Sequence, residues 1–260
     1  MPPAHLEACG AVTPLVLGGI AGALVLALIH FLAGFLQFLK GVPRSRWLSF
    51  AGGVSIAYVI VHLLPELSEH QETLAASAGP ALAFLELHVY LVTLTGLAVY
   101  YGLERMVRRH KQSRSRAQSE EAAGETESQI FWIHVVSFGL YNFLVGYLLV
   151  TWEEPGSQSL LFFFLAMAFH FIVNDYGLED THQEDYQRKG RWILAAALLV
   201  GAFVGVVFEI HEAIVALLTA FLAGGIILNT LKEELPAERE SRFGAFVLGA
   251  AAYAVLLTVL

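Results

Sequence analysis

Five amide or ionisable side chains fall inside two long apolar stretches near the middle of the chain: His134, Asn142, His170, Asn174 and Asp175. Such groups are costly at the depth of a bilayer and usually face the interior of a helix bundle or a cavity. Imidazole nitrogen suits zinc, copper, iron and nickel, whereas amide and carboxylate oxygens suit harder cations. We therefore predict that these residues form a divalent-cation transport site, with interhelical hydrogen bonding as their alternative role.

Helical geometry places members of this set at similar depths. At the helical rise per residue, Asn142 and His170 each lie about 18 Å from one end of their own apolar stretch, near the middle of a bilayer. His170 and Asn174 are four residues apart and share one helix face. His134 and Asp175 lie at a matching depth closer to one surface, and Asp175 points away from the face of His170 and Asn174.

The composition requires a membrane around these residues. Hydrophobic residues make up 57% of the 260 residues and charged residues 15%, which leaves too little polar surface for a soluble globule. The formal net charge of −8 argues against a nucleic-acid partner, which would require a basic face. Cys9 is the only cysteine, so neither an intrachain disulfide nor a cysteine-based zinc site can form.

We predict an all-α, polytopic membrane protein with a single membrane domain over 1–260. The apolar stretches are close to the length that spans a bilayer as a helix. Eight such spans can be read between polar breaks, at 12–39, 47–66, 83–104, 130–152, 158–177, 192–208, 211–231 and 243–260. Only four residues, 209–212, separate spans six and seven, but one helix over both would be twice as long as the bilayer is thick.

The basic residues predict the orientation of the spans. All fifteen Lys and Arg residues lie in the connections after spans one, three, five and seven. Since cytoplasmic loops carry the excess of Lys and Arg, both termini are expected outside a cell membrane. The connection 106–129 has a basic half and an acidic half without aromatic residues, and we expect it to be a disordered cytoplasmic loop.

A second set of acidic and histidine side chains falls at the outer ends of these spans: His62, Glu66, Glu209, His211 and Glu212. An acidic entrance would concentrate cations and steer them inward. We therefore expect these residues to form the outer entrance of a cation path. The alternative is that loops without Lys or Arg are simply polar by other means.

Two spans also resemble each other. Residues 51–66 read AGGVSIAYVIVHLLPE and residues 223–238 read AGGIILNTLKEELPAE. In the predicted topology these segments cross the bilayer in opposite directions. We therefore predict an inverted repeat that relates spans one to three to spans six to eight, around a central pair formed by spans four and five, as in many secondary transporters.

Four features together resemble the ZIP (Zrt/Irt-like) family of divalent metal transporters: the eight spans, the position of both termini outside, the loop after span three and the AGG…HLLPE segment. The resemblance covers about 15–260. It implies an eight-helix bundle, a transport site on spans four and five, and a homodimer. In that family span four carries the motif His-Asn-x-Pro-Glu-Gly, and span five carries His/Gln-x-x-Pro-Glu.

This chain matches those motifs only in part. In span four Asn142 and Gly146 match, and the other motif positions are Tyr141, Leu144 and Val145. In span five His170 matches, whereas Val173 and Asn174 replace the proline and the glutamate. The resemblance therefore implies a divergent member with a degenerate transport site.

Three functions follow as expectations. The first is transport of a divalent metal, zinc above all, or of another small cation, across the lipid bilayer. The second is a non-transporting ZIP-like homologue that senses metal or acts as a partner of another membrane protein. The third is an intramembrane zinc hydrolase using His170, His134 and Asp175. We expect no enzymatic activity and no organic cofactor under either of the first two.

Overall fold

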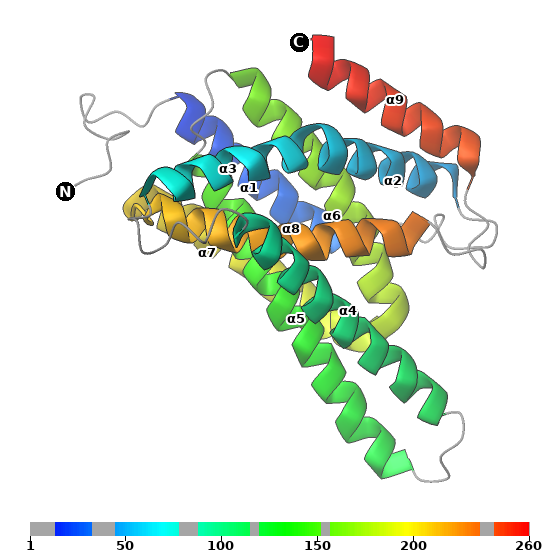
Figure 1. The fold of residues 1–260 in the computed structure, drawn as a ribbon. Helices are drawn as coiled ribbons and strands as arrows, with labels where there is room; N and C mark the ends of the chain where they lie inside the picture. The colour runs from blue at the N-terminus through cyan, green and yellow to red at the C-terminus, as the bar shows by residue number, and fades with distance from the viewer. Residues whose placement is uncertain are drawn as a thin grey trace.

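The computed structural model describes residues 14–32, 45–77, 88–114, 120–151, 157–234 and 242–259. Every regular element in these ranges is helical (Figure 1). The α-helices are α1 (Pro14–Leu32), α2 (Arg46–Tyr58), α3 (Leu64–Ser77), α4 (His88–Arg114), α5 (Glu120–Val150), α6 (Ser157–Asp185), α7 (Arg191–Val207), α8 (Glu212–Glu234) and α9 (Phe243–Val259). Two π-helical turns, η3 (Val59–Leu63) and η5 (Tyr186–Gly190), join α2 to α3 and α6 to α7.

The chain is an all-α membrane protein by the length and composition of its helices. Six described segments are long and apolar enough to cross a bilayer: Pro14–Leu32, Arg46–Glu69, Phe131–Val150, Leu160–Asp180, His182–Val207 and Ala213–Lys232. The segment Phe243–Thr258 in α9 is apolar but shorter. This segment and α4 correspond to the other two spans that the sequence predicted.

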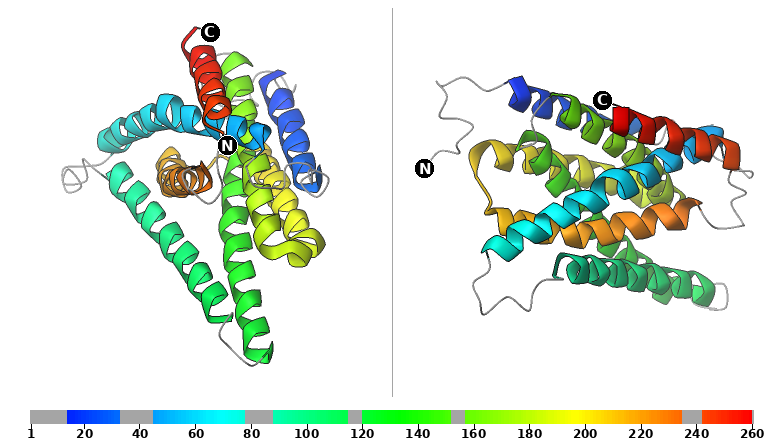
Figure 2. Two further views of the ribbon diagram at one scale, coloured as in Figure 1. Left: turned by 90° about the vertical axis from the view of Figure 1, so that its right-hand side faces the viewer. Right: turned by 45° about the horizontal axis from the view of Figure 1, so that its top comes forward.

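The helices form two groups. The first bundle consists of α1, α5, α6 and α7, which pack on one another, most extensively α5 on α7. The second bundle consists of α2 with η3 and α3, together with α4, α8 and α9; here α2 packs along α9 and α4 along α8. Figure 2 shows α8 end-on between α4 and α5. Contact between the two bundles is less extensive and lies chiefly between α2 and α6.

Glycines allow the closest helix contacts of the second bundle. A methyl group added at Gly53 in α2 would overlap the carbonyl oxygen of Phe246 in α9, and one added at Gly224 in α8 would overlap that of Thr93 in α4. Only a residue without a Cβ lets the backbones approach this closely, as small residues do at membrane-helix interfaces. Both glycines belong to the Ala-Gly-Gly segments that begin the two similar stretches.

We expect Gly53→Ala to destabilise the chain by about 1–3 kcal/mol, because α9 must move away from α2. Gly139→Ala is the matched control. A methyl group there meets no atom within 4 Å, so the better helix propensity of alanine should stabilise α5 by about 0.5–1 kcal/mol. Thermal unfolding in detergent, followed by circular dichroism, measures both changes. Equal effects of the two substitutions would contradict the close approach of α2 and α9.

Two interruptions of regular α-helix affect the candidate site: the π turn before Pro65 and the turn between α7 and α8. Pro65 has no backbone N–H, and directly before it the helix widens to a π turn in which the N–H of Leu64 bonds the carbonyl oxygen of Val59. This turn carries His62 and leads into the turn that carries Glu66. Further along, α7 ends at Val207 and α8 begins at Glu212, so the chain turns through 208–211, where the sequence predicted the break.

The connection 106–129 was predicted to be disordered, but its described residues are helical. There α4 continues to Arg114 and α5 begins at Glu120, and the two ends project together from the rest of the molecule (Figure 1). Only 115–119 lie outside the described residues of this segment. The physical reason is that its Arg, Lys, Glu, Gln and Ala residues are good helix formers, and each half extends a helix that is already nucleated.

Candidate functional site

A chain of hydrogen bonds crosses the first bundle and joins α1, α5 and α6. The Nδ1 atom of His30 lies 2.8 and 3.0 Å from the two carboxylate oxygens of Asp175. Its Nε2 atom lies 2.8 Å from Oδ1 of Asn142. All three side chains have no solvent exposure. Two of the predicted cation ligands, Asn142 and Asp175, are therefore held together by a histidine from a third helix.

The hydrogen-bond partners define where the protons of this network lie. The amide nitrogen of Asn142 donates to the carbonyl oxygen of Phe138 at 2.8 Å, so its Oδ1 accepts from His30. Nε2 of His30 must then carry a proton. Nδ1 and the carboxylate of Asp175 share one further proton, which makes the pair neutral as a whole whichever of them holds it. The charge of Asp175 is thus balanced within the bundle, as a buried carboxylate requires.

The other three predicted ligands have different partners. Oδ1 of Asn174 accepts from the amide of Asn229 in α8 at 3.3 Å, which joins the two bundles. Nδ1 of His134 lies 2.9 Å from Nε2 of His182, so one of these ring nitrogens donates to the other. His170 is buried and meets the ring of Tyr141 edge-on, with centroids 5.5 Å apart.

The five predicted residues thus do not share one set of partners. Two share the network around His30, and the other three have different neighbours. Among the side chains that the structure describes, no group of three His, Cys, Asp or Glu residues is placed to hold a metal ion.

The predicted outer set is partly brought together. Nε2 of His62 lies 4.0 Å from a carboxylate oxygen of Glu66, and each side chain is 20% exposed. Glu209 and His211 are exposed in the turn before α8, where the N–H of Ala213 donates to Nδ1 of His211. Glu212 begins α8, and its side chain lies outside the described residues.

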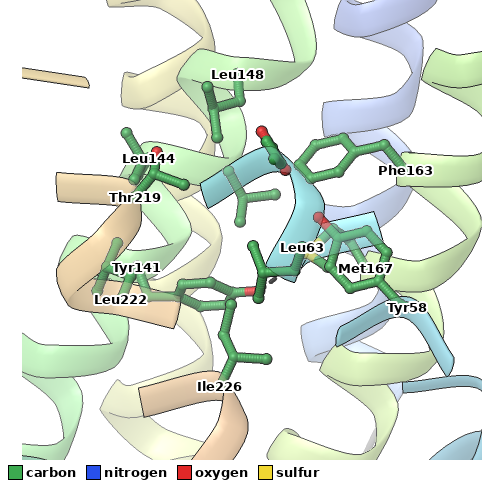
Figure 3. A pocket seen from close by; sticks show the side chains of 12 residues that line it. Tyr58, Leu63, Tyr141, Leu144, Leu148, Phe163, Met167, Thr219, Leu222 and Ile226 are labelled. Carbon is green, nitrogen blue, oxygen red and sulfur yellow. Dashed lines mark hydrogen bonds between the residues drawn. The ribbon is translucent and has the colours of Figure 1, made fainter. Parts of the chain in front are cut away.

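A pocket lies between the two bundles (Figure 3), and Glu66 is one of the residues that line it. The first bundle contributes Tyr141, Leu144, Val145 and Leu148 from α5 and Phe163 and Met167 from α6; the second contributes Tyr58, Leu63 and Glu66 from the α2–α3 segment and Thr219, Leu222 and Ile226 from α8. Its volume is about 20 Å³, enough for a molecule the size of water.

The pocket wall is mainly apolar, with a few polar groups. The hydroxyl of Tyr141 points across the pocket and donates to Sδ of Met167 at 2.9 Å (Figure 3). The hydroxyl of Thr219 is buried and has no hydrogen-bond partner in the described part of the chain. Glu66 contributes the one carboxylate that the described residues bring to this wall.

Sequence reasoning did not include His30 or Thr219 among the site residues. His30 is the only ionisable residue in Pro14–Leu32, and that isolation was the available signal. Thr219 carries no comparable signal, because threonine is ordinary in a membrane helix and its unpartnered hydroxyl appears only in three dimensions.

No family model matches the chain, and no curated protein matches it significantly.

Proposed function

We propose that the chain is a ZIP-like membrane transporter of a small cation, and that the cation passes between the two bundles through the pocket that contains Glu66. The observation that carries this proposal is the position of the pocket. It is lined from both bundles, which pack more extensively within themselves than on each other, and it holds a carboxylate in an otherwise largely apolar wall. Separation of the bundles on one side and then on the other would expose Glu66 alternately.

The finer topology belongs to the same proposal: eight spans, both termini outside, and an inverted repeat around α5 and α6. The glycine contacts support the repeat. Gly53 in span two packs on span eight, and Gly224 in span seven packs on span three. An inverted repeat of spans one to three and six to eight would relate these two contacts to each other.

The resemblance to the ZIP family implies a divalent metal as the substrate. Tyr141, Leu144 and Val145 occupy the positions of that family's His, Pro and Glu in span four, and all three line the pocket. The pocket therefore lies where the resemblance expects the cation. In this chain its negative charge comes instead from Glu66, at the end of the segment that resembles span two of the family.

Uptake into proteoliposomes tests this proposal. We expect Glu66→Gln to lower the initial rate of cation uptake by about a hundredfold, because the cation loses the only carboxylate among the described residues that line the pocket. Glu69→Gln is the matched control, since Glu69 is exposed one turn further along the same helix and is outside the pocket wall. Equal rates for the two variants would remove Glu66 from the path.

One observation favours the second candidate, a non-transporting ZIP-like homologue. In a transporter with its site inside the first bundle, Asn142 and Asp175 would bind the cation. In the structure, both already have His30 as their shared partner. For this candidate, metal would bind to the purified chain without any uptake into liposomes. The same proteoliposomes distinguish the two functions.

A further inference from the structure

We infer that Arg191, the first residue of α7, binds the phosphate group of an anionic phospholipid in the leaflet around this end of α1 and α7. The inference goes beyond the proposed function, since it requires a bilayer around the chain but no transport of a cation. It follows from the level of Arg191 in the bilayer, from the charge and fixed position of its guanidinium, and from the apolar surface beside it.

The level of Arg191 follows from its contact with the end of α1. Helix α1 has 19 residues, which correspond to about 28 Å at the helical rise and nearly match the thickness of the hydrocarbon core. Its last two residues, Phe31 and Leu32, therefore lie where the lipid headgroups begin. The guanidinium carbon of Arg191 lies over the Phe31 ring, 5.7 Å from its centre, so Arg191 is at the same level.

Two aromatic side chains hold the guanidinium in place. The π electrons of the Phe31 ring attract the cation that lies over it. The ring of Trp192 meets the Phe31 ring edge-on, with centroids 4.8 Å apart, and Trp192 is 59% exposed, as is typical of tryptophan at the membrane–water interface. Because the guanidinium is already oriented, a ligand loses less entropy in ordering it.

No carboxylate of the described residues pairs with Arg191. Arg188 and Lys189, in the turn before it, each pair with the acidic side chain four residues earlier, at 3.3 and 3.7 Å. Residues 33–45, which follow α1 in the sequence, contain no Asp or Glu. Among the guanidinium nitrogens of Arg191, Nε is enclosed without a partner in the described part of the chain, whereas the two Nη groups are not enclosed. The Nη groups are thus the donors that a ligand can reach.

A phosphate group suits these donors. A planar guanidinium binds the oxygens of a phosphate through charge-assisted hydrogen bonds, which are stronger than those between neutral groups. In phosphatidylcholine the choline cation compensates the charge of the phosphate, whereas phosphatidylglycerol keeps its full negative charge. Arg191 should therefore prefer phosphatidylglycerol, because no nearby carboxylate of the described residues repels it.

The surface beside Arg191 suits acyl chains. Trp192, Leu199 and Phe203 follow one another after seven and four residues, so they share one face of α7, and all three are exposed. Helix α1 packs on α7 and adds the exposed side chain of Leu28. A soluble phosphate would contact only the guanidinium, whereas the acyl chains of a phospholipid would also cover this apolar face. The surface therefore favours a lipid over a soluble anion.

Native mass spectrometry of the delipidated full chain in detergent, titrated with lipid, tests the inference. We expect the first dioleoylphosphatidylglycerol to bind about tenfold more tightly than dioleoylphosphatidylcholine, which has the same acyl chains. Arg191→Gln should remove this preference, since a tenfold change is what one charge-assisted hydrogen bond supplies. Arg191→Lys keeps the charge but lacks the planar group, so it should weaken the binding of phosphatidylglycerol about threefold.

Arg188→Gln is the matched control. It removes the same charge three residues earlier, from an exposed side chain that pairs with Glu184. The affinity for phosphatidylglycerol and the preference over phosphatidylcholine should both stay at the wild-type values. Thermal unfolding of all variants in lipid-free detergent identifies any that have lost the fold, and Arg191→Lys then remains as the milder replacement.

Three results would overturn the inference. The first is equal affinity of the wild-type chain for the two lipids. The second is an equal loss of phosphatidylglycerol binding in Arg191→Gln and Arg188→Gln, which would indicate general attraction to a basic surface. The third is displacement of phosphatidylglycerol by an equal concentration of glycerol phosphate, which would assign the position to a soluble phosphate. Cation uptake enters none of these measurements, so failure of the proposed function would be seen separately.

Discussion

Asp175→Ala should lower the stability of the chain by about 3–5 kcal/mol, because it removes one partner of a fully buried, hydrogen-bonded pair. In the folded protein both carboxylate oxygens of Asp175 lie within hydrogen-bond distance of His30, and neither side chain is exposed to solvent. Without the carboxylate, Nδ1 of His30 would have no hydrogen-bond partner, and water does not reach this position to replace it. Thermal unfolding in detergent, followed by circular dichroism, measures the change.

Asp180→Ala is the control for this experiment, since Asp180 is exposed on the same helix. The double replacement His30→Leu with Asp175→Leu should recover much of the loss, because two apolar side chains often replace a buried ion pair without cost. Unfolding of Asp175→Ala and Asp180→Ala at the same temperature would show that the network around His30 does not hold α1, α5 and α6 together.

Leu222→Trp should reduce cation uptake to the rate of protein-free liposomes. Leu222 is 2% exposed and lines the pocket from α8. The pocket holds about one water-sized molecule, so the larger indole ring would fill the space that the cation needs. The initial rate of uptake by purified protein in liposomes measures the effect.

Leu217→Trp provides the comparison, because Leu217 is 39% exposed on the same helix and lies outside the pocket wall. It should transport at the wild-type rate. Gel filtration of both variants shows whether the larger side chain has disturbed the fold. If a well-folded Leu222→Trp variant transports as fast as Leu217→Trp, the cation does not pass through this pocket.

The broad architecture could be predicted because the bilayer imposes a strong rule on the sequence. A helix that spans the hydrocarbon core needs a long apolar run, and six such helices are present among the described residues. The turn at 208–211 was predictable for the same reason, since one helix through it would have been too long. The helical ends of α4 and α5 were missed because a charged composition is compatible with either disorder or an extended helix.

For the candidate site, only the depth of its residues in the bilayer could be predicted from the sequence. Helical rise placed Asn142 and His170 near the same level, but it carries no information about which helices are neighbours. In the structure α1 packs on both α5 and α6, so His30 reaches Asn142 and Asp175, while His170 meets Tyr141. The orientation of Asp175 also depends on this packing, because α1 is the helix that Asp175 faces inside the bundle.

The pocket could not be predicted from residue types. Most of its wall is built from side chains that are ordinary in membrane helices, such as Leu222 and Val145. Its position depends on how the first bundle meets the second. Glu66 was recognised in the sequence as an entrance residue, but its placement in the pocket wall required the α2–α3 segment to pack beside α5, α6 and α8.

The most direct test of transport through the pocket is the initial uptake rate of Zn²⁺, Cd²⁺ and Mn²⁺ into liposomes that contain the wild-type chain, measured beside Leu222→Trp. Our account predicts saturable uptake of at least one of these cations by the wild-type chain and none by the variant. Uptake that never exceeds that of protein-free liposomes, or that is the same for both proteins, would contradict it.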